Sequence, residues 1–225
     1  METLHGVLAE LRARAVPARL EGFRRVAIPT ERALGVSIPD LRAISRKHRR
    51  DHDLALLLWD SGVHEARILA GMVDDPKLVT PDQMERWVAK FDAWDVCDGV
   101  CDLFRETPWA WEKAWAWCER DEEFVRRAGF VLIARMAVHC KSEPDATFVA
   151  ALDVIRRHAG DERNFVKKAV NWALRQVGKR SVALNAAAIA AAEQIRADGS
   201  KSGRWIANDA LRELRSDAVQ SRLAC

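Results

Sequence analysis

The stretches FVRRAGFVLIARM (residues 124–136) and FVKKAVNWALRQV (residues 165–177) share one layout, and they start 41 residues apart. Each follows an acidic, polar turn, opens with Phe-Val and two basic residues, and continues into apolar residues. Apolar residues that recur every three or four positions predict a helix. We therefore expect two helices that occupy equivalent places in two copies of a repeat.

The rest of the chain has the same helical character. Ala, Leu, Arg, Glu and Lys dominate, and Pro39, Pro81 and Pro144 stand at expected helix starts. Weaker echoes of the repeat occur at residues 65–70 and 204–207. A period near 40 residues built from helix pairs is typical of HEAT or armadillo-type stacking. The sequence therefore predicts an all-α fold, a HEAT/armadillo-like α-solenoid of stacked antiparallel helix pairs with a concave basic groove, in a single domain over residues 1–225.

The composition is that of a soluble globular protein. Of 225 residues, 49% are hydrophobic and 31% are charged, and the formal net charge is only +3. That excess is too small to identify a nucleic-acid binder by itself. The sequence shows no apolar run that could span a membrane and no signal-peptide core, so we expect a cytoplasmic protein. The five cysteines form no CxxC pair and are expected to be reduced and mostly buried.

Basic side chains recur at one place in the repeats, near the start of the second helix. A stripe of this kind suits a DNA backbone, whereas ordinary solvated helix faces are the more common explanation of charge alone. The residues concerned are Arg67, Arg126, Arg127, Lys167 and Lys168, followed by Arg175, Lys179, Arg180, Lys201 and Arg204.

The segment WDVCD (residues 94–98) places an indole near two carboxylates. Trp94 and Asp98 are four positions apart and share one helix face, and Asp95 lies close to that face. An indole beside a carboxylate suits a visiting cation. From spacing alone, a core tryptophan beside an aspartate paired with an arginine such as Arg127 is the simpler interpretation.

Other tryptophans divide into two groups. Trp172 lies close behind Lys167 and Lys168 on the same helix, where an aromatic ring can stack on a sugar or base, although core packing competes with that role. The segment at residues 106–120 carries four more tryptophans, of which Trp111 and Trp115 share a helix face and predict packing between helices.

Several chemistries have no motif in this sequence. The six histidines are scattered without metal-ligand spacing, and there is no glycine-rich phosphate loop and no GxSxG. We therefore expect no metal and no organic cofactor.

With these residues in view, the chain resembles the AlkD-type DNA alkylation-repair proteins, bacterial DNA glycosylases built from HEAT-like repeats. The matching segments are LGVSIPDLR (34–42), LWDSGVHEAR (58–67), WDVCD (94–98), Arg126-Arg127 and KKAVNWALR (167–175). Members of this family release N3- and N7-alkylated purines from duplex DNA without drawing the damaged base into a protein pocket.

The resemblance implies site residues and partners for this chain. The catalytic cleft would contain Trp94, Asp98 and Trp172, with Arg127 holding the backbone near the lesion. The expected partner is double-stranded DNA with alkylated purines, and the expected enzyme is a monofunctional, monomeric glycosylase of base excision repair with no obligate protein partner. The alternative is a non-catalytic HEAT-like protein that binds damaged or branched DNA.

Overall fold

The computed structural model describes residues 2–224, and those residues contain helices and no strand. The first part of the chain holds α1 (Glu2–Ala13), the 3-10 helix η1 (Pro17–Arg19), α2 (Leu20–Arg25), α3 (Ile38–Ser45), α4 (His52–Asp60), α5 (His64–Val73), α6 (Pro81–Val88) and α7 (Trp94–Phe104). The second part holds α8 (Ala110–Cys118), α9 (Glu123–His139), α10 (Asp145–His158), α11 (Asn164–Gly178), α12 (Val182–Ala197), α13 (Lys201–Leu214) and α14 (Asp217–Leu223). The prediction of an all-α protein is confirmed.

The helices group into two compact units. Unit 1 is Met1–Ala110 and unit 2 is Trp111–Cys225. Each unit has its own buried core. The expectation of a single domain over residues 1–225 stays a prediction.

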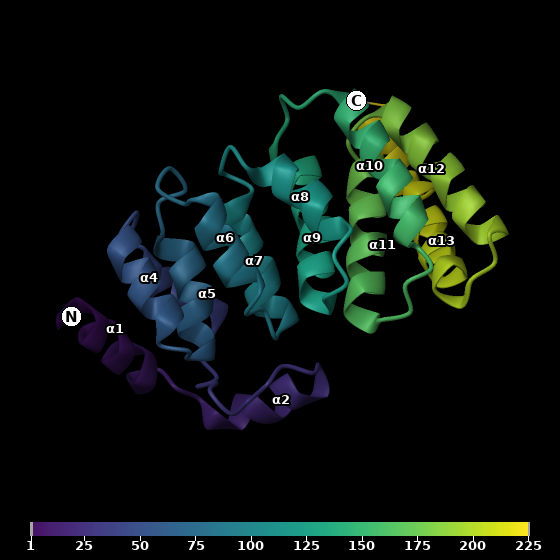
Figure 1. Cartoon of the computed structure of the whole chain (residues 1–225). Helices are drawn as coiled ribbons and strands as arrows, with labels where there is room; N and C mark the ends of the chain where they lie inside the picture. The colour runs from purple at the N-terminus through teal and green to yellow at the C-terminus, as the bar shows by residue number, and fades with distance from the viewer. Residues whose placement is uncertain (1, 225) are drawn as a thin grey trace. The chain divides into compact units, whose positions relative to one another are not determined.

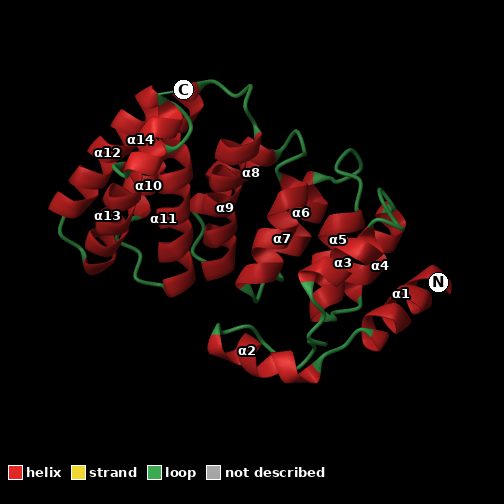
Figure 2. Ribbon diagram, turned by 180° about the vertical axis from the view of Figure 1, so that it is seen from behind, coloured by secondary structure: helices red, strands yellow, loops and turns green. Residues whose placement is uncertain are grey.

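Unit 1 is organised around α5, which packs against α3, α4 and α7 (Figure 2). Its core contains Leu58 and Leu69, both fully buried, and a stacked pair of indoles, Trp59 and Trp87, whose ring centroids are 4.4 Å apart. Burying large aromatic side chains in this way is a main source of stability for a helical unit. The α5–α7 packing fixes the start of α7, where the WDVCD segment lies.

Unit 2 contains a row in which α11 lies between α9 and α13, while α10 packs on α12 (Figure 1). The rings of Phe124 on α9 and Phe165 on α11 are 5.2 Å apart, so the first residues of the two repeated stretches contact each other. Gly129 allows the close packing of α9 on α8, because a Cβ atom there would lie 2.6 Å from the backbone nitrogen of Cys118. The repeat that the sequence predicts is therefore a pair of neighbouring helices in unit 2.

Helix starts lie at the three prolines that the sequence analysis singled out. The Ser37 hydroxyl accepts a hydrogen bond from the Asp40 N–H at the start of α3, and the Thr80 hydroxyl accepts one from the Gln83 N–H at the start of α6. Proline occupies an early position in both helices, where its missing N–H costs nothing. Pro144 is the residue before α10. The three helix starts expected from the sequence are confirmed.

The thiols and tryptophans lie where the sequence places them. Cys97, Cys101 and Cys118 are buried and Cys140 is partly exposed, none of the four in a disulfide, whereas Cys225 lies outside the described residues. Trp111 and Trp115 stack on α8, and the Trp111 ring centroid lies 5.4 Å from that of Phe148 on α10, which confirms packing between helices at that face. Across residues 2–224, every helix is too short or too polar to cross a lipid bilayer.

Candidate nucleic-acid interface

The first turn of α7 presents the indole and the carboxylate that the sequence singled out. Trp94 is the first residue of α7, and its indole N–H donates to the Val26 carbonyl, with 3.1 Å between nitrogen and oxygen. This bond holds the ring against the segment that follows α2 and leaves it only partly buried. Asp98 lies one turn further along α7 and is also partly exposed. A cationic ligand can therefore reach both side chains.

The Asp95 carboxylate is hydrogen-bonded to protein groups. Its carboxylate lies 2.8 Å from Nε2 of His64, a side chain that is only 6% exposed, and it accepts a hydrogen bond from the Val96 N–H. These bonds join the starts of α5 and α7. The structure thus gives Asp95 a pairing role, while Asp98 is a partly exposed carboxylate one turn beyond Trp94.

The buried carboxylate of Glu65 fixes the loop before α3. It accepts hydrogen bonds from the backbone N–H groups of Leu34, Gly35 and Val36 at distances from 2.6 to 3.2 Å. Gly35 has a φ of +77°, which a side chain would oppose. The segments LGVSIPDLR and LWDSGVHEAR therefore form one structural unit beside the α7 start.

Arg67 lies inside unit 1 and its guanidinium is held by protein groups. The residue is 8% exposed, donates to the Asp92 carboxylate at 2.7 Å and to the Lys90 carbonyl, and lies 4.5 Å from the ring centroid of Trp59. A charge this fully engaged is costly to redirect toward a ligand. Contact of Arg67 with DNA stays a prediction of the sequence, and the structure shows its guanidinium bound to protein groups.

Unit 1 has a groove that the sequence analysis did not predict, lined by four arginines and by the acids Asp74, Asp102 and Glu106. The groove has a volume of about 520 Å³, with Gly71 and Gly99 among its lining residues. Within residues 2–224, its four exposed arginines have no carboxylate partner. They are Arg42, Arg46, Arg49 and Arg50, and their spacing along residues 42–50 was the signal that could have revealed them.

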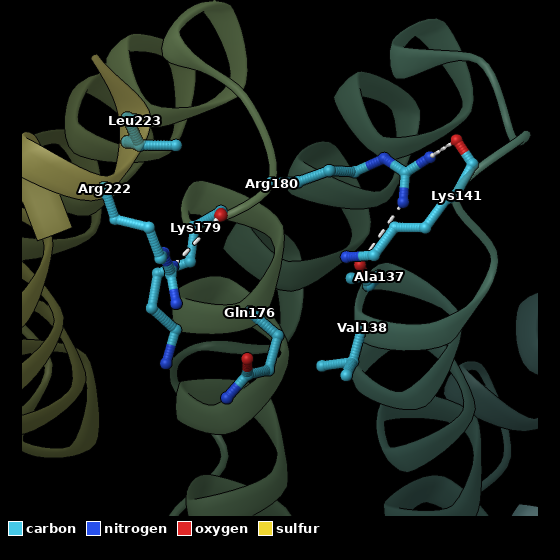
Figure 3. A pocket seen from close by; sticks show the side chains of 8 residues that line it. All are labelled: Ala137, Val138, Lys141, Gln176, Lys179, Arg180, Arg222 and Leu223. Carbon is cyan, nitrogen blue, oxygen red and sulfur yellow. Dashed lines mark hydrogen bonds between the residues drawn. The ribbon is translucent and has the colours of Figure 1, made fainter. Parts of the chain in front are cut away.

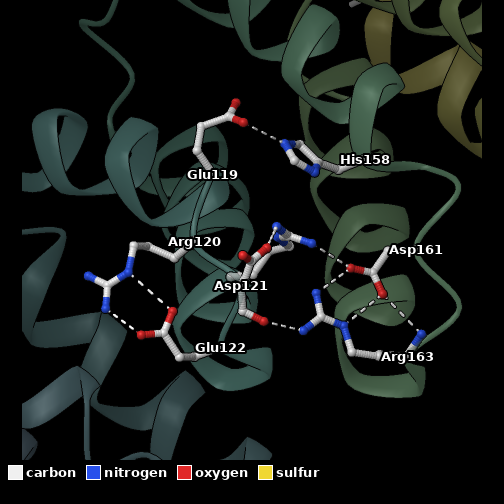
Figure 4. Close-up of polar contacts among 8 residues, drawn as sticks. Glu119, Arg120, Asp121, Glu122, His158, Asp161 and Arg163 are labelled. Atoms are coloured by element: carbon white, nitrogen blue, oxygen red, sulfur yellow. Dashed lines mark hydrogen bonds and ion pairs between the residues drawn. The ribbon is translucent and has the colours of Figure 1, made fainter.

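At the start of α9, Arg126 is part of an ion-pair network with Asp121 and Asp161, which lie in the turns before α9 and α11. Figure 4 shows Asp121, Asp161 and Arg163 of this network. Arg126 lies 3.1 Å from Asp121 and 3.0 Å from Asp161, and Arg163 contacts the same Asp161 carboxylate. Burial opposes ionisation of Asp161, but the hydrogen bonds from Arg163 and Arg126 outweigh it and lower its pKa to about 2. Arg126 therefore links two repeats.

Arg127 is nearly buried, with 6% of its surface exposed. Its guanidinium donates to the Phe165 carbonyl at 2.8 Å, which joins α9 to the second residue of α11. The sequence predicts that Arg127 holds a DNA backbone. That role stays a prediction, and the structure adds a bond between neighbouring repeats.

Helix α11 presents one face with Lys168, Trp172, Arg175 and Lys179, spaced at helical intervals. Lys168 is exposed and Trp172 is partly exposed. The Arg135 guanidinium lies 5.1 Å from the Trp172 ring centroid. Gln176 accepts a 3.0 Å hydrogen bond from the Trp172 indole when its amide oxygen faces that ring. These contacts fix the orientation of the indole on the helix face.

The far end of this face is neutralised by an acid on α13. Glu213 contacts Arg175 at 2.6 Å and Lys179 at 2.5 Å. Burial opposes ionisation of Glu213, but Lys179 and Arg175 outweigh it and lower its pKa. Beyond them is a pocket of about 310 Å³, lined by Lys141, Lys179, Arg180 and Arg222 among others (Figure 3). The cations at this end are largely committed to protein partners.

Within unit 1 the structure brings Trp94 and Asp98 together on one helical turn, and within unit 2 it brings Lys168, Trp172, Arg175 and Lys179 together on one helix face. The expectation that the two sets form one cleft stays a prediction.

Comparisons with known proteins agree with this fold. A solved structure from "a new family of proteins related to the HEAT-like repeat DNA glycosylases with affinity for branched DNA structures" matches with a TM-score of 0.83 and 19% identity, over 98% of this chain and 95% of that one. The HEAT-like fold that the repeats predict is therefore confirmed.

The sequence matches the family described as DNA alkylation repair enzyme over residues 7–214. Because this match spans most of the chain, the protein belongs to the DNA alkylation repair family. Two bacterial proteins are also similar to this chain in sequence. The uncharacterized protein Lmo0209 of Listeria monocytogenes is 26% identical over 65% of this chain and 66% of its own length, and the uncharacterized protein Lin0241 of Listeria innocua is 25% identical over 87% of each.

Proposed function

We propose that this protein is a monofunctional DNA glycosylase that hydrolyses the N-glycosidic bond of cationic N3- and N7-alkylated purines in duplex DNA. The observation that carries the proposal is the partly exposed Asp98 one turn beyond Trp94 on α7, in a member of the DNA alkylation repair family. Asp95, the competing carboxylate, is bound to His64.

The charge of the lesion decides the chemistry. An alkylated N3 or N7 already carries positive charge, so the base can leave without protonation by a general acid. As the glycosidic bond breaks, the deoxyribose becomes oxocarbenium-like. A fixed carboxylate stabilises that charge and positions the water that attacks C1′. We assign this role to Asp98.

The indoles hold the nucleotide in this proposal. We assign Trp94 and Trp172 the binding of the cationic nucleotide through their ring faces, with each contact worth about 0.5–2 kcal/mol. Trp94 is oriented by the Val26 carbonyl and Trp172 by Gln176. Discrimination then comes mainly from the lability of the lesion, so base flipping into a pocket is not required.

We assign duplex binding to the basic residues that remain available in unit 2. Lys168 is exposed, Lys167 is partly exposed, and neither has a carboxylate partner in residues 2–224. Both lie at the start of α11, where the helix end adds partial positive charge. Arg126, Arg127, Arg175 and Lys179 support this surface while bonded to protein groups.

A second candidate is a DNA-binding protein without catalysis. It is favoured by the structural match, because that protein is described as having affinity for branched DNA structures. The test is incubation of the protein with methylated duplex DNA, with released bases and DNA affinity measured on the same sample. Release of N7-methylguanine and N3-methyladenine supports the glycosylase. Tight binding with no released base supports the second candidate.

A further inference from the structure

Trp205 on α13 is an indole that the proposed glycosylase chemistry does not use. It is 43% exposed, which is unusual for so large an apolar side chain. The Lys167 ammonium, on the neighbouring helix α11, lies 5.0 Å from its ring centroid. The ring is therefore held between two adjacent repeats and still reaches solvent.

The residues around Trp205 are basic. Lys201 lies four positions before it and shares its helix face, Arg204 is its direct neighbour, and Lys168 follows Lys167 on α11. Within residues 2–224, none of these four cations has a carboxylate partner. They also lie in the first turns of α11 and α13, where the helix ends carry partial positive charge. Arg204 also donates to the Gly199 carbonyl. Four cations without a carboxylate partner in the described residues make this patch complementary to a polyanion.

The acids of this surface are engaged elsewhere. Asp209, one turn beyond Trp205, accepts a hydrogen bond from the Asn171 amide at 2.8 Å and contacts Arg212. Glu213 holds Arg175 and Lys179. The first turns of α11 and α13 therefore differ from the rest of this face in having an exposed aromatic ring and cations without acids.

An exposed ring flanked by cations is the arrangement that binds single-stranded nucleic acid, since a base stacks on the ring while the cations contact phosphates. A paired duplex offers no free base face to such a ring. We infer that Trp205, with Lys167, Lys168, Lys201 and Arg204, binds an unpaired base of a single-stranded DNA segment next to a duplex. This inference rests on DNA being the ligand, as proposed above, and not on base release.

The test compares two DNA probes of equal paired length, one blunt and one forked with oligothymidine arms, by fluorescence anisotropy. The variants are Trp205→Ala, Trp205→Phe and the control Trp109→Ala, which removes a 36% exposed indole from unit 1. Thermal unfolding of each variant checks that its fold is retained.

The wild type is expected to bind the fork more tightly than the blunt duplex. Trp205→Ala should lower the fork-to-blunt affinity ratio about fivefold or more, since stacking of one base contributes about 1–3 kcal/mol. Trp205→Phe should keep most of the ratio, and Trp109→Ala should keep all of it. An unchanged ratio in Trp205→Ala, or an equal loss on both probes, would overturn the inference. If the protein releases no base but its preference for the fork depends on Trp205, the glycosylase proposal fails and the inference about Trp205 stands.

Discussion

The start of α7 in unit 1 and the start of α11 in unit 2 differ in charge although both belong to HEAT-like helices. The α7 start offers an indole and a reachable carboxylate, Trp94 and Asp98, while Asp95 is bound to His64. The α11 start offers Lys167 and Lys168, which have no carboxylate partner in residues 2–224. The proposed function therefore assigns base release to α7 and binding of the DNA backbone to α11, so substitutions on the two helices should affect the two properties separately.

The largest expected effect is a loss of base release on substitution of Asp98 in α7. Asp98→Asn removes the charge assigned to the oxocarbenium-like sugar, so base release should fall about 100- to 1000-fold, as when a group that stabilises transition-state charge is lost. Affinity for undamaged duplex should stay within about twofold, because surface substitutions away from a contact change little. Asp102→Asn, on the same helix, is the matched control. Equal rates for both variants would remove Asp98 from the mechanism.

The next effect is on the α11 side. The double variant Lys167→Gln with Lys168→Gln should weaken duplex binding about tenfold at low salt. It should also reduce the slope of log affinity against log salt by about two, since each phosphate contact contributes about 0.9. The control is Arg156→Gln with Arg157→Gln, an adjacent exposed pair on α10. A salt slope that stays at its wild-type value would show that the α11 start does not contact phosphates.

A smaller effect, an increase in duplex affinity, is expected from a substitution near the C-terminal end of α11. Glu213→Gln frees Arg175 and Lys179 from their carboxylate partner, so duplex affinity should rise about two- to fivefold, the size of a surface ion pair. Equilibrium titration at fixed salt measures the change. Weaker binding by the variant would mean that Glu213 positions these cations for DNA.

The smallest effect is a pH dependence of stability in unit 2. The folded state lowers the pKa of Asp161 from 3.8 to about 2, so its ion pairs stabilise the fold fully above pH 3.8 and lose that effect as the pH falls toward 2. Thermal unfolding between pH 5 and pH 2 should therefore show less loss of stability for Asp161→Asn than for the wild type. Parallel curves for the two proteins would contradict the role of Asp161 in linking α9 and α11.

The fold was accessible from the sequence because its signals are local. Helix starts follow from a proline near the first helical residue, as at Pro39 and Pro81, and the repeat follows from matching residues 41 positions apart. The contact between Phe124 and Phe165 is the three-dimensional form of that match. A sequence repeat predicts such stacking because each copy buries its face on the next.

The site was accessible only in part, because side-chain partners lie far away in sequence. Arg67 belongs to the predicted basic stripe, yet it contacts Asp92 and the ring of Trp59, and spacing alone gives no sign of those contacts. The same holds for Arg127 and the Phe165 carbonyl. Trp205 is the reverse case. Composition alone would assign its ring to the core, but the structure shows it exposed.

The most direct measurement of the central claim compares a cationic with a neutral base at one position of one duplex. Single-turnover rates of release are measured for N7-methylguanine and for hypoxanthine, with duplex affinity recorded for both. The proposal gives Asp98 the stabilisation of the developing sugar charge and requires no general acid, so we predict release of the cationic base and none of hypoxanthine at equal affinity. Comparable release of hypoxanthine, or no release of N7-methylguanine from a bound duplex, would contradict the account.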